Sequence, residues 1–323
     1  MIEDQQISKF ECDLHCHTNR SDGNDTPKIL IDRAVSLGMR AIAITDHDVA
    51  PPDIITVNDQ ALNIRSYAQQ QGLNIVLGCE FSTDTYVSDV HIIGYELDWN
   101  DSAFKKEMEK AKKSKSEAYK RLTELLTANG LPIDYENEIL RYTDQDGQEH
   151  HRKPEDVEKK FIFEKMAEKG YTSNWGEAKI MVTDSPELNI RREKIDPLWT
   201  IELIHQCGGI AVLAHPYLID SNVKPQSLAE MTRSQYINRL IENGLDGIEA
   251  RYTYNKTSYK GTKSIDQIEK EVKNLYGDRL FISGGSDYHA GGKKGIKNPR
   301  EIGEAGIDYI NFKKIFKNII NEI

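Results

Sequence analysis

The chain has 323 residues, of which 38% are hydrophobic and 29% charged, and its formal net charge is −10. This length suits one large α/β domain or two ordinary ones, and the acidic balance argues against an extended nucleic-acid-binding surface. No apolar run approaches a membrane span, the polar start does not resemble a secretory signal, and the four cysteines form neither a zinc-knuckle spacing nor a disulfide framework. We therefore expect a cytoplasmic protein with reduced thiols and no membrane partner.

The first strand signal leads into the stretch Cys-Asp-Leu-His-Cys-His-Thr-Asn-Arg-Ser-Asp-Gly at residues 12–23. Side chains alternate faces along a strand, so His15 and His17 are expected to point the same way while Cys16 points away. Asp22 lies in the turn that follows. Two imidazoles with a nearby carboxylate are typical ligands of a divalent metal, although Asp22 also suits a simple turn.

Strand and helix signals alternate along the first hundred residues. Helical spacing of apolar residues predicts helices over 27–37 and 58–71, each followed by a glycine. Short apolar runs predict strands over 41–44, 74–77 and 90–95. These strands end in or contain three further candidate ligands, His47, Glu80 and His91. Two of them have simpler interpretations, since His47 could cap the next helix and His91 could be a core histidine.

The amino-acid composition changes near residue 101, where Lys- and Glu-rich segments begin. The region has two predicted helices and two mostly irregular polar stretches, in the order 103–129, 133–154, 155–169 and 170–193. We interpret residues 101–195 as a helical insertion that caps the site, between the two parts of one barrel at 1–100 and 196–323. The charges of the insertion are best explained as a solvated helical face.

The last third of the chain returns to alternating elements. Helices are predicted over 197–207, 236–243, 265–275 and 309–320, and strands over 210–214, 247–250 and 280–283. His215 follows one of these strands, and the last strand runs into Gly-Ser-Asp-Tyr-His, which contains Asp287 and His289. The alternation predicts parallel βα units, and seven strands predict a distorted barrel with every ligand at, or just after, the carboxyl end of a strand.

Nine ligand-type side chains fall at the predicted strand ends, namely His15, His17, Asp22, His47, Glu80, His91, His215, Asp287 and His289. Mixed imidazole and carboxylate ligands suit Zn²⁺, Mn²⁺ or Fe²⁺ better than Mg²⁺ or Ca²⁺. Nine ligands are too many for one ion, so we expect a cluster of two or three ions, which typically binds a hydroxide and a phosphoryl group together. The other histidines, His150, His151 and His205, lack such a context and are expected to be surface or structural.

The ordered motifs resemble the PHP (polymerase and histidinol phosphatase) family, in its small-molecule phosphoesterase branch. They are Asp-Leu-His-x-His with Ser-Asp-Gly, Thr-Asp-His-Asp, Gly-x-Glu, His-x-x-Gly, Ala-His-Pro, a second Gly-x-Glu and Gly-Ser-Asp-x-His, within residues 12–100 and 197–295. The resemblance implies a distorted (β/α)₇ TIM-like barrel with a trinuclear metal centre at its mouth. The implied ligand sets are His15, His17, Glu80 and Asp287 for one ion, Glu80, His91 and His215 for a second, and Asp22, His47 and His289 for a third.

The resemblance also implies an activity. It implies a metal-dependent phosphatase that hydrolyses a phosphomonoester of a small metabolite or nucleotide by attack of a metal-bridging hydroxide. A phosphodiesterase acting on cyclic phosphates or short oligonucleotides is the first alternative. Histidinol phosphatase fits less well, because Asp22 stands where some members have histidine. A non-enzymatic, metal-stabilised module would lack ligands, and an amidohydrolase would be expected to show a metal-bridging lysine, for which there is no candidate.

Four further residues are candidates for proton transfer or substrate binding. Asp48 is a candidate proton donor, although the residue pattern favours a helix N-cap over this role. Arg251 and Lys293 follow strand-end motifs and are candidate phosphate contacts, with solvated surface as the alternative for the lysine. Lys159 lies in Glu-Lys-Lys-Phe, where relatives that act on nucleotide phosphates often carry Gly-Arg-Pro-His. This stretch keeps a positive charge but lacks the histidine.

Overall fold

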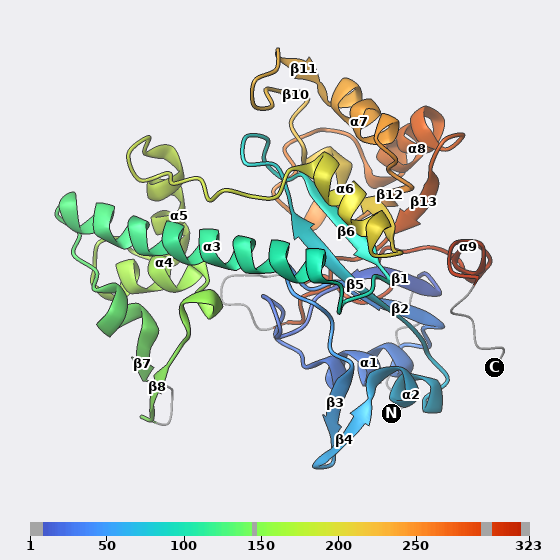
Figure 1. Ribbon diagram of the computed structural model, residues 1–323, viewed down its shortest axis with the longest axis horizontal. Helices are drawn as coiled ribbons and strands as arrows, with labels where there is room; N and C mark the ends of the chain where they lie inside the picture. The colour runs from blue at the N-terminus through green and yellow to red at the C-terminus, as the bar shows by residue number, and fades with distance from the viewer. Residues whose placement is uncertain (1–8, 144–146, 292–298, 318–323) are drawn as a thin grey trace. The chain divides into compact units, whose positions relative to one another are not determined.

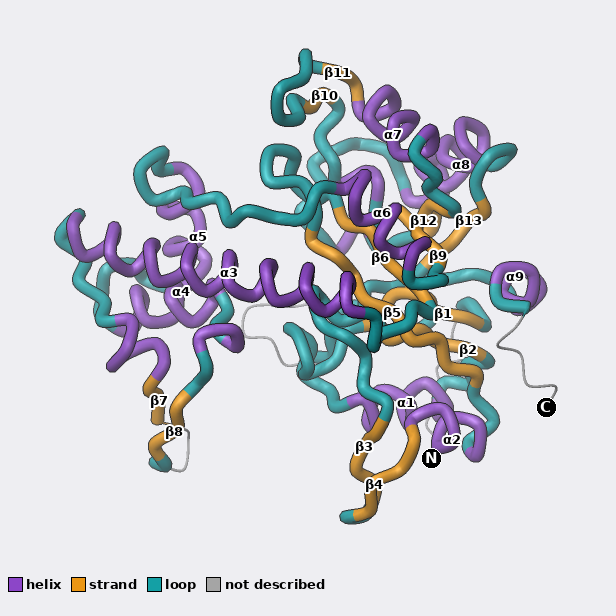
Figure 2. The backbone as a smooth tube through the Cα atoms, in the orientation of Figure 1, coloured by secondary structure: helices purple, strands orange, loops and turns teal. Residues whose placement is uncertain are grey.

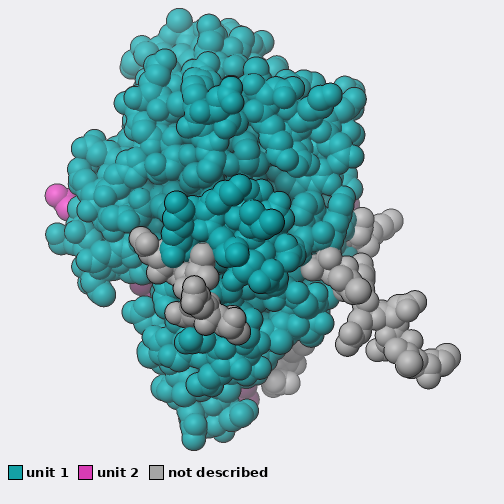
Figure 3. All heavy atoms as spheres, turned by 90° about the vertical axis from the view of Figure 1, so that its right-hand side faces the viewer, with its two compact units in different colours: residues 1–105, 195–323 teal, residues 106–194 magenta. Residues whose placement is uncertain are grey.

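The computed structural model describes residues 9–143, 147–291 and 299–317. The chain divides into two compact units, which Figure 3 shows in different colours. The first consists of residues 1–105 and 195–323, and the second of residues 106–194. Among the described helices, none combines the length and the apolar character that crossing a membrane requires.

A seven-stranded sheet forms the centre of the first unit (Figure 1). In spatial order its strands are β1 (Cys12–Cys16), β2 (Ala41–Ile44), β5 (Asn74–Ser82), β6 (His91–Tyr95), β9 (Ile210–Leu213), β12 (Gly247–Arg251) and β13 (Phe281–Gly284). After β13 the chain returns to β1, where the Tyr288 carbonyl accepts a hydrogen bond from the His17 N–H at 2.8 Å. The sheet is a nearly closed barrel, so the predicted distorted (β/α)₇ fold is confirmed.

The barrel is buried on both faces, as the alternation along β2 shows. Its two alanines belong to the interior cluster and its two isoleucines to the cluster under the outer helices. The helices of this unit are α1 (Pro27–Ser36), α2 (Ile64–Gln70), α6 (Pro197–Gln206), α7 (Arg233–Glu242), α8 (Ile265–Tyr276) and α9 (Tyr309–Ile315), with short 3₁₀ turns η3 (Pro216–Leu218) and η4 (Tyr254–Lys256). A small hairpin of β10 (Asn222–Val223) and β11 (Met231–Thr232) precedes α7.

β6 corrects the prediction that all strands are parallel. It runs antiparallel to both β5 and β9. The connection at 83–90 is shorter than the roughly dozen residues that a parallel crossover needs. Asp84 turns the chain there, since its Oδ1 accepts hydrogen bonds from the N–H groups of Tyr86 and Val87 at 2.8 and 2.9 Å. His91 therefore begins its strand, at the barrel edge where the parallel strands end, and the expectation of a carboxyl-end position is wrong for this residue.

A β-hairpin replaces the first part of the helix predicted over 58–71 (Figure 2). β3 (Ile54–Val57) pairs with β4 (Gln60–Asn63) through a two-residue turn. Asn58 and Asp59 form this turn with φ angles of 49° and 63°, the left-handed geometry that tight hairpins favour. The helix begins only at Ile64, after the side chain of Asn63 caps it by accepting the Ser66 N–H at 3.1 Å.

The second unit has a hydrophobic core of its own. Its elements are α3 (Ser102–Ala128, which begins in the first unit), the π-helix η1 (Tyr135–Leu140), a hairpin of β7 (Arg141–Thr143) and β8 (Glu149–His151), the 3₁₀ turn η2 (Pro154–Asp156), α4 (Lys159–Glu168) and α5 (Trp175–Asp184). Buried side chains such as Leu126 and Met166 fill it. α5 lies in a stretch predicted to be irregular, and Asn174 caps it by accepting the Glu177 N–H at 3.0 Å. The capping of the site by this insertion stays a prediction.

The aromatic residues of α9 complete the interior of the barrel, which gives a first testable prediction. Phe312 is fully buried in the interior cluster, and its ring lies 5.2 Å from that of Phe316. We expect Phe312→Ala to lower the free energy of unfolding by about 3–5 kcal/mol, because it removes a buried ring and leaves a cavity. Chemical denaturation measures this loss. Ile310→Ala on the same helix is the control, because Ile310 is 64% exposed and should change stability little.

Candidate metal centre

The end of β1 supplies the first two candidate ligands. His15 lies on β1 and His17 directly follows it, and both side chains are fully buried with their Nε2 atoms 3.1 Å apart. The orientation predicted from strand alternation is therefore what the structure has. The chain after β13 packs closely against this point, since a Cβ at Gly285 would lie only 2.3 Å from the Cβ of His15.

Glu80 lies among five of the six predicted histidine ligands and is 1% exposed. Its Oε1 is 2.8 Å from Nδ1 of His91 and 3.0 Å from Nε2 of His215. Its Oε2 is 3.2 Å from a ring nitrogen of each of the other three, His15, His17 and His47. The two oxygens thus face different histidines, an arrangement that suits a carboxylate shared between two groups of ligands.

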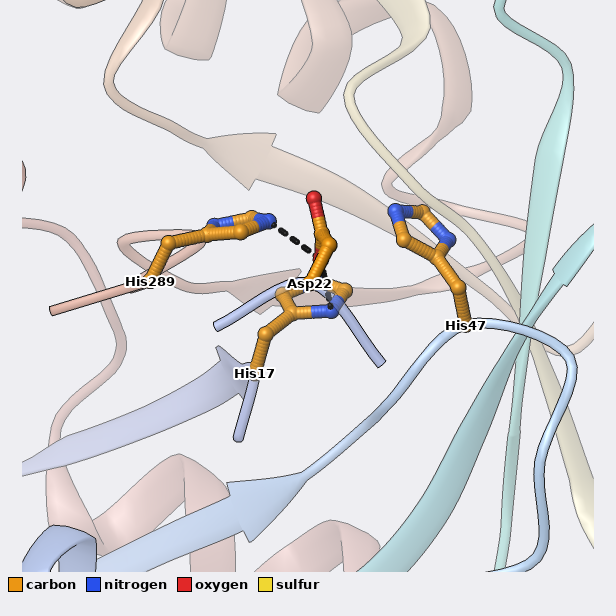
Figure 4. Close-up of side chains that lie close together, drawn as sticks. All are labelled: His17, Asp22, His47 and His289. Carbon is orange, nitrogen blue, oxygen red and sulfur yellow. Dashed lines mark ion pairs between the residues drawn. The ribbon is translucent and has the colours of Figure 1, made fainter. Parts of the chain in front are cut away.

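Asp22 gathers a neighbouring group of histidines (Figure 4). Its Oδ1 lies 2.9 Å from Nε2 of His289 and 3.7 Å from Nδ1 of His17. Figure 4 shows the carboxylate flanked by His289 and His47, with the ring of His17 below it. His17 presents Nε2 to Glu80 and Nδ1 to Asp22, so it stands between the two groups.

This donor set fits divalent cations. Ligand atoms lie within 4.8 Å of one another in three groups: His15, His17 and Glu80; His47, Glu80 and His91; and His17, Asp22, His47 and His289. Buried polar atoms in proteins normally have hydrogen-bond partners. Within the described part of the chain, the buried Nδ1 atoms of His17 and His47 have none. Lone pairs that point into a polar cluster without a donor are suited to a metal ion.

The electrostatics of the cluster oppose the effect of burial. Burial raises the pKa of the Glu80 carboxyl, but the surrounding imidazoles, above all those of His47 and His15, hold it well below its usual range. Burial lowers the pKa of His17, yet Asp287 and Glu80 outweigh it and raise that pKa to about 9. The carboxylates thus stay ionised, with the protonated ring of His17 compensating their charge, a role that a bound cation would take over.

Three residues of the barrel mouth have left-handed backbones. Asp48, His215 and Asp287 adopt φ angles of 49°, 29° and 54°. Aspartate takes this conformation at low cost, whereas at His215 it costs about 1–3 kcal/mol, and such a backbone persists only where its surroundings hold it. At Asp48 this support is visible, because its Oδ1 accepts the Ser82 N–H at 2.8 Å. Strain of this kind is concentrated at functional sites.

Glu249 is a buried carboxylate to which the sequence analysis assigned no role. It is 2% exposed, its Oε1 lies 3.3 Å from Nδ1 of His15, and its Oε2 accepts the His215 N–H at 2.8 Å. A carboxylate on Nδ1 fixes a histidine tautomer in which Nε2 keeps the lone pair for a metal. The second Gly-x-Glu motif marks Glu249 in the sequence, but only the fold shows that it holds His15 and His215.

We expect Glu249→Gln to weaken Mn²⁺ binding and activity by about 10- to 100-fold, as for other residues that orient metal ligands. The amide cannot accept both hydrogen bonds as a carboxylate does. Mn²⁺ titration of the chelator-treated protein measures the effect. Asp246→Asn is a matched control, because Asp246 also accepts one backbone N–H, from Ala211, and one imidazole, from His205, both at 2.8 Å. Equal losses in both variants would contradict a specific role of Glu249.

Asp287 divides its two carboxylate oxygens between different partners. Oδ1 faces the cluster, 3.1 Å from Nε2 of His17. Oδ2 accepts hydrogen bonds from the Tyr252 hydroxyl, at 2.6 Å, and from Nη1 of Arg300. Arg300 lies in a polar stretch without a recognisable motif, so no sequence signal identified it.

The structure turns Arg251 away from the predicted role of phosphate contact. Its Nη1 lies 2.5 Å from carboxylate oxygens of both Asp266 and Glu269, which belong to α8. These contacts place the guanidinium on the outside of β12, whereas Glu249 on the same strand faces the histidines. The irregular register between Glu249 and Arg251 breaks the two-residue alternation that would have put both on one face.

The other substrate candidates stay predictions. Lys159 is the first residue of α4 in the second unit, where its Nζ lies 5.7 Å from the centre of the Phe163 ring. Lys293 falls outside the described residues. His150 and His151 lie on the exposed β8, as expected for surface residues.

Comparisons with known proteins agree with the motifs. The family model of the PHP domain matches residues 13–172. A 5'-3' exoribonuclease of Haemophilus influenzae is 28% identical over 205 residues, which cover 63% of this chain and 68% of the relative. A 3',5'-nucleoside bisphosphate phosphatase of Chromobacterium violaceum is 26% identical over 299 residues, which cover 90% of each chain.

The fold is also found among solved structures. A crystal structure from Bifidobacterium adolescentis, described as a metal-dependent phosphoesterase, superposes with a TM-score of 0.67. It covers 96% of this chain and 97% of its own, at 22% identity. At this identity the likeness shows a shared fold.

Proposed function

Because this chain belongs to the PHP domain family and is a metal-dependent phosphoester hydrolase, we propose that it releases phosphate from a phosphomonoester of a small metabolite or nucleotide. The observation that carries the proposal is Glu80, a buried carboxylate whose two oxygens face separate groups of histidines. Such a shared carboxylate suits a site with more than one ion, as used for phosphoryl chemistry.

We assign the ligands to three ions, Mn²⁺, Fe²⁺ or Zn²⁺. His15, His17, Glu80 and Asp287 would hold the first, Glu80, His91 and His215 the second, and Asp22, His47 and His289 the third. The distances around Glu80 and Asp22 support this division. When bound, such ions activate water and neutralise charge on the phosphoryl oxygens.

The chain's own groups have the remaining roles. Glu249 holds the His15 ring in one tautomer, and Tyr252 holds one oxygen of Asp287. We propose Asp48 as the proton donor to the leaving oxygen. Its carboxylate is oriented by the Ser82 N–H at the end of β5. A proton donor causes the rate to fall at high pH, where it loses its proton. If Asp48→Asn still shows this fall in its pH–rate profile, Asp48 is not the proton donor.

The net charge of the chain and the name of one similar protein support a small phosphomonoester as the substrate. The Chromobacterium relative, which is named for a nucleoside bisphosphate phosphatase activity, aligns along nearly the whole chain and supports a monoester. The Haemophilus relative is named as an exoribonuclease and favours a second candidate, cleavage of short oligonucleotides. The net charge of −10 disfavours a long nucleic-acid partner. The four buried, unpaired cysteines support a reducing cytoplasmic setting.

Phosphate release from a panel of phosphorylated metabolites tests the proposal. The protein is reconstituted with Mn²⁺, and a chelated sample is the control. Chelator-sensitive release from one class of monoester is the expected result. If no monoester releases phosphate while short oligonucleotides or cyclic phosphates are cleaved, the protein is a phosphodiesterase instead.

A further inference from the structure

Arg300 places a permanent positive charge beside the candidate metal ligands. Its side chain is 20% exposed, and Nη1 donates to Oδ2 of Asp287 and, at 3.1 Å, to the Tyr252 hydroxyl. The Tyr252 hydroxyl donates to the same oxygen of Asp287 at 2.6 Å. Oδ2 of Asp287 is thereby held by two donors, which leaves Oδ1 as the oxygen that faces the histidines.

The second terminal nitrogen of Arg300 has no good acceptor nearby. Nη2 lies 3.4 Å from Nδ1 of His289. That Nδ1 is also 2.9 Å from the Asp287 carbonyl, which can only accept, so Nδ1 carries the proton whenever Nε2 of His289 binds a metal ion. In that state two donors face each other. Among the described residues, Nη2 makes no hydrogen bond apart from this long contact.

The charge of Arg300 does not help metal binding. A fixed cation close to a metal site repels the ions and reduces the attraction that Asp287 offers them. A partly exposed guanidinium with a free N–H edge is, however, well suited to bind the oxygens of a phosphate. The exposure, the free edge and the position next to His289 thus all point to an anionic ligand.

We propose that Arg300 is a phosphate-binding residue of this site, which anchors on Asp287 through Nη1 and binds the phosphoryl group of the substrate through its Nη2 edge. The proposal rests on the proposed function only in requiring a phosphoester substrate, whether monoester or diester. It adds a residue that lies outside the metal-ligand motifs and links a metal ligand directly to the substrate.

Binding of inorganic phosphate to the Mn²⁺-loaded protein tests the proposal, with calorimetry as the readout. We expect Arg300→Gln to weaken phosphate binding by about tenfold to a hundredfold, the loss typical of a charge-assisted hydrogen bond. Its Mn²⁺ content should stay within twofold of wild type, because Tyr252 still holds Asp287. Arg300→Lys keeps a charge but loses the planar fork, so its phosphate affinity should lie between those of the wild type and Arg300→Gln.

A control variant separates phosphate binding from local structure. Arg33→Gln breaks the ion pair between Arg33 and Glu301, which anchors the same segment as Arg300. It should leave phosphate binding unchanged.

The outcomes distinguish this proposal from the proposed function. If Arg300→Gln binds phosphate as wild type does, or loses Mn²⁺ together with phosphate, Arg300 is not a phosphate-binding residue. The same holds if the Mn²⁺-loaded wild type does not bind phosphate at all. If phosphate binding depends on Arg300 while no monoester is hydrolysed, the proposal stands and the proposed substrate class is wrong.

Discussion

The Glu80→Gln variant is expected to lose bound Mn²⁺ and to hydrolyse phosphate esters about a thousandfold more slowly than the wild type. Glutamine keeps the size of the side chain but replaces one oxygen by an NH₂ donor. One of the two groups of histidines, either His91 with His215 or His15 with His17, would then face a donor where the wild type offers a carboxylate oxygen. Bound ions contribute several kcal/mol to phosphoryl transfer, and each 1.4 kcal/mol or so is a tenfold change in rate.

Thermal unfolding with and without Mn²⁺ measures the binding part of this prediction independently of activity. A ligand at 100 times its dissociation constant stabilises the folded state by about 2.7 kcal/mol. The wild type should therefore melt at a higher temperature with Mn²⁺, and Glu80→Gln should not. Glu96→Gln is the control, because Glu96 follows the far end of β6 and binds the Leu77 N–H at 2.7 Å and Arg65. If Mn²⁺ raises the melting temperature of Glu80→Gln as much as that of the wild type, Glu80 is not a central metal ligand.

The positions of most candidate ligands follow from local rules, and these were predictable. His15 and His17 are two positions apart, on and just after a strand, so strand geometry alone puts them together. Glu80 and His215 follow apolar runs, and parallel strands bring such positions to one edge. The direction of β6 was not predictable from periodicity, because a run of apolar residues looks the same in a parallel and in an antiparallel strand. The predicted strands left residues 78–89 for a crossover, and only the extension of β5 to Ser82 in the structure makes the connection too short.

Turn chemistry explains the error over 58–71. The residues of β4 and α2 together show helical spacing of apolar side chains, and this spacing outweighed the dipeptide Asn58-Asp59 in the prediction. Asparagine and aspartate adopt left-handed conformations at low cost, and here they close a hairpin. The alternating run before them, with exposed Ile54 and buried Ile55, is the pattern of a strand.

The contacts of the arginines could not be predicted at all. Arg251 follows a strand-end motif and was assigned to the substrate, but the irregular register of β12 turns it to α8. Arg300 is far from any motif and reaches Asp287 because the chain after β13 folds back on the barrel mouth. Sequence patterns describe which face of a local element a residue occupies. They do not describe which loop returns to which strand end.

Gly285→Ala is the second change from which we expect a large effect, through the closure of the barrel. The Cβ of an alanine would lie 2.3 Å from the Cβ and 2.6 Å from the backbone nitrogen of His15. The backbone of Gly285 is not left-handed, so the cost is steric overlap with β1 and not conformational strain. We expect the free energy of unfolding to fall by about 3 kcal/mol, as in severe overpacking. Any relaxation must move His15, so Mn²⁺ affinity should fall as well.

Gly291→Ala separates this closure effect from the ordinary cost of replacing a glycine. Gly291 lies in the same returning segment, but a Cβ there would meet nothing within 4 Å. Its stability and Mn²⁺ affinity should stay near those of wild type. The combination matters because a residue that only supported the fold would change stability alone. A Gly285→Ala protein that is destabilised yet binds Mn²⁺ as tightly as wild type would show that the metal centre does not depend on the contact between this segment and β1.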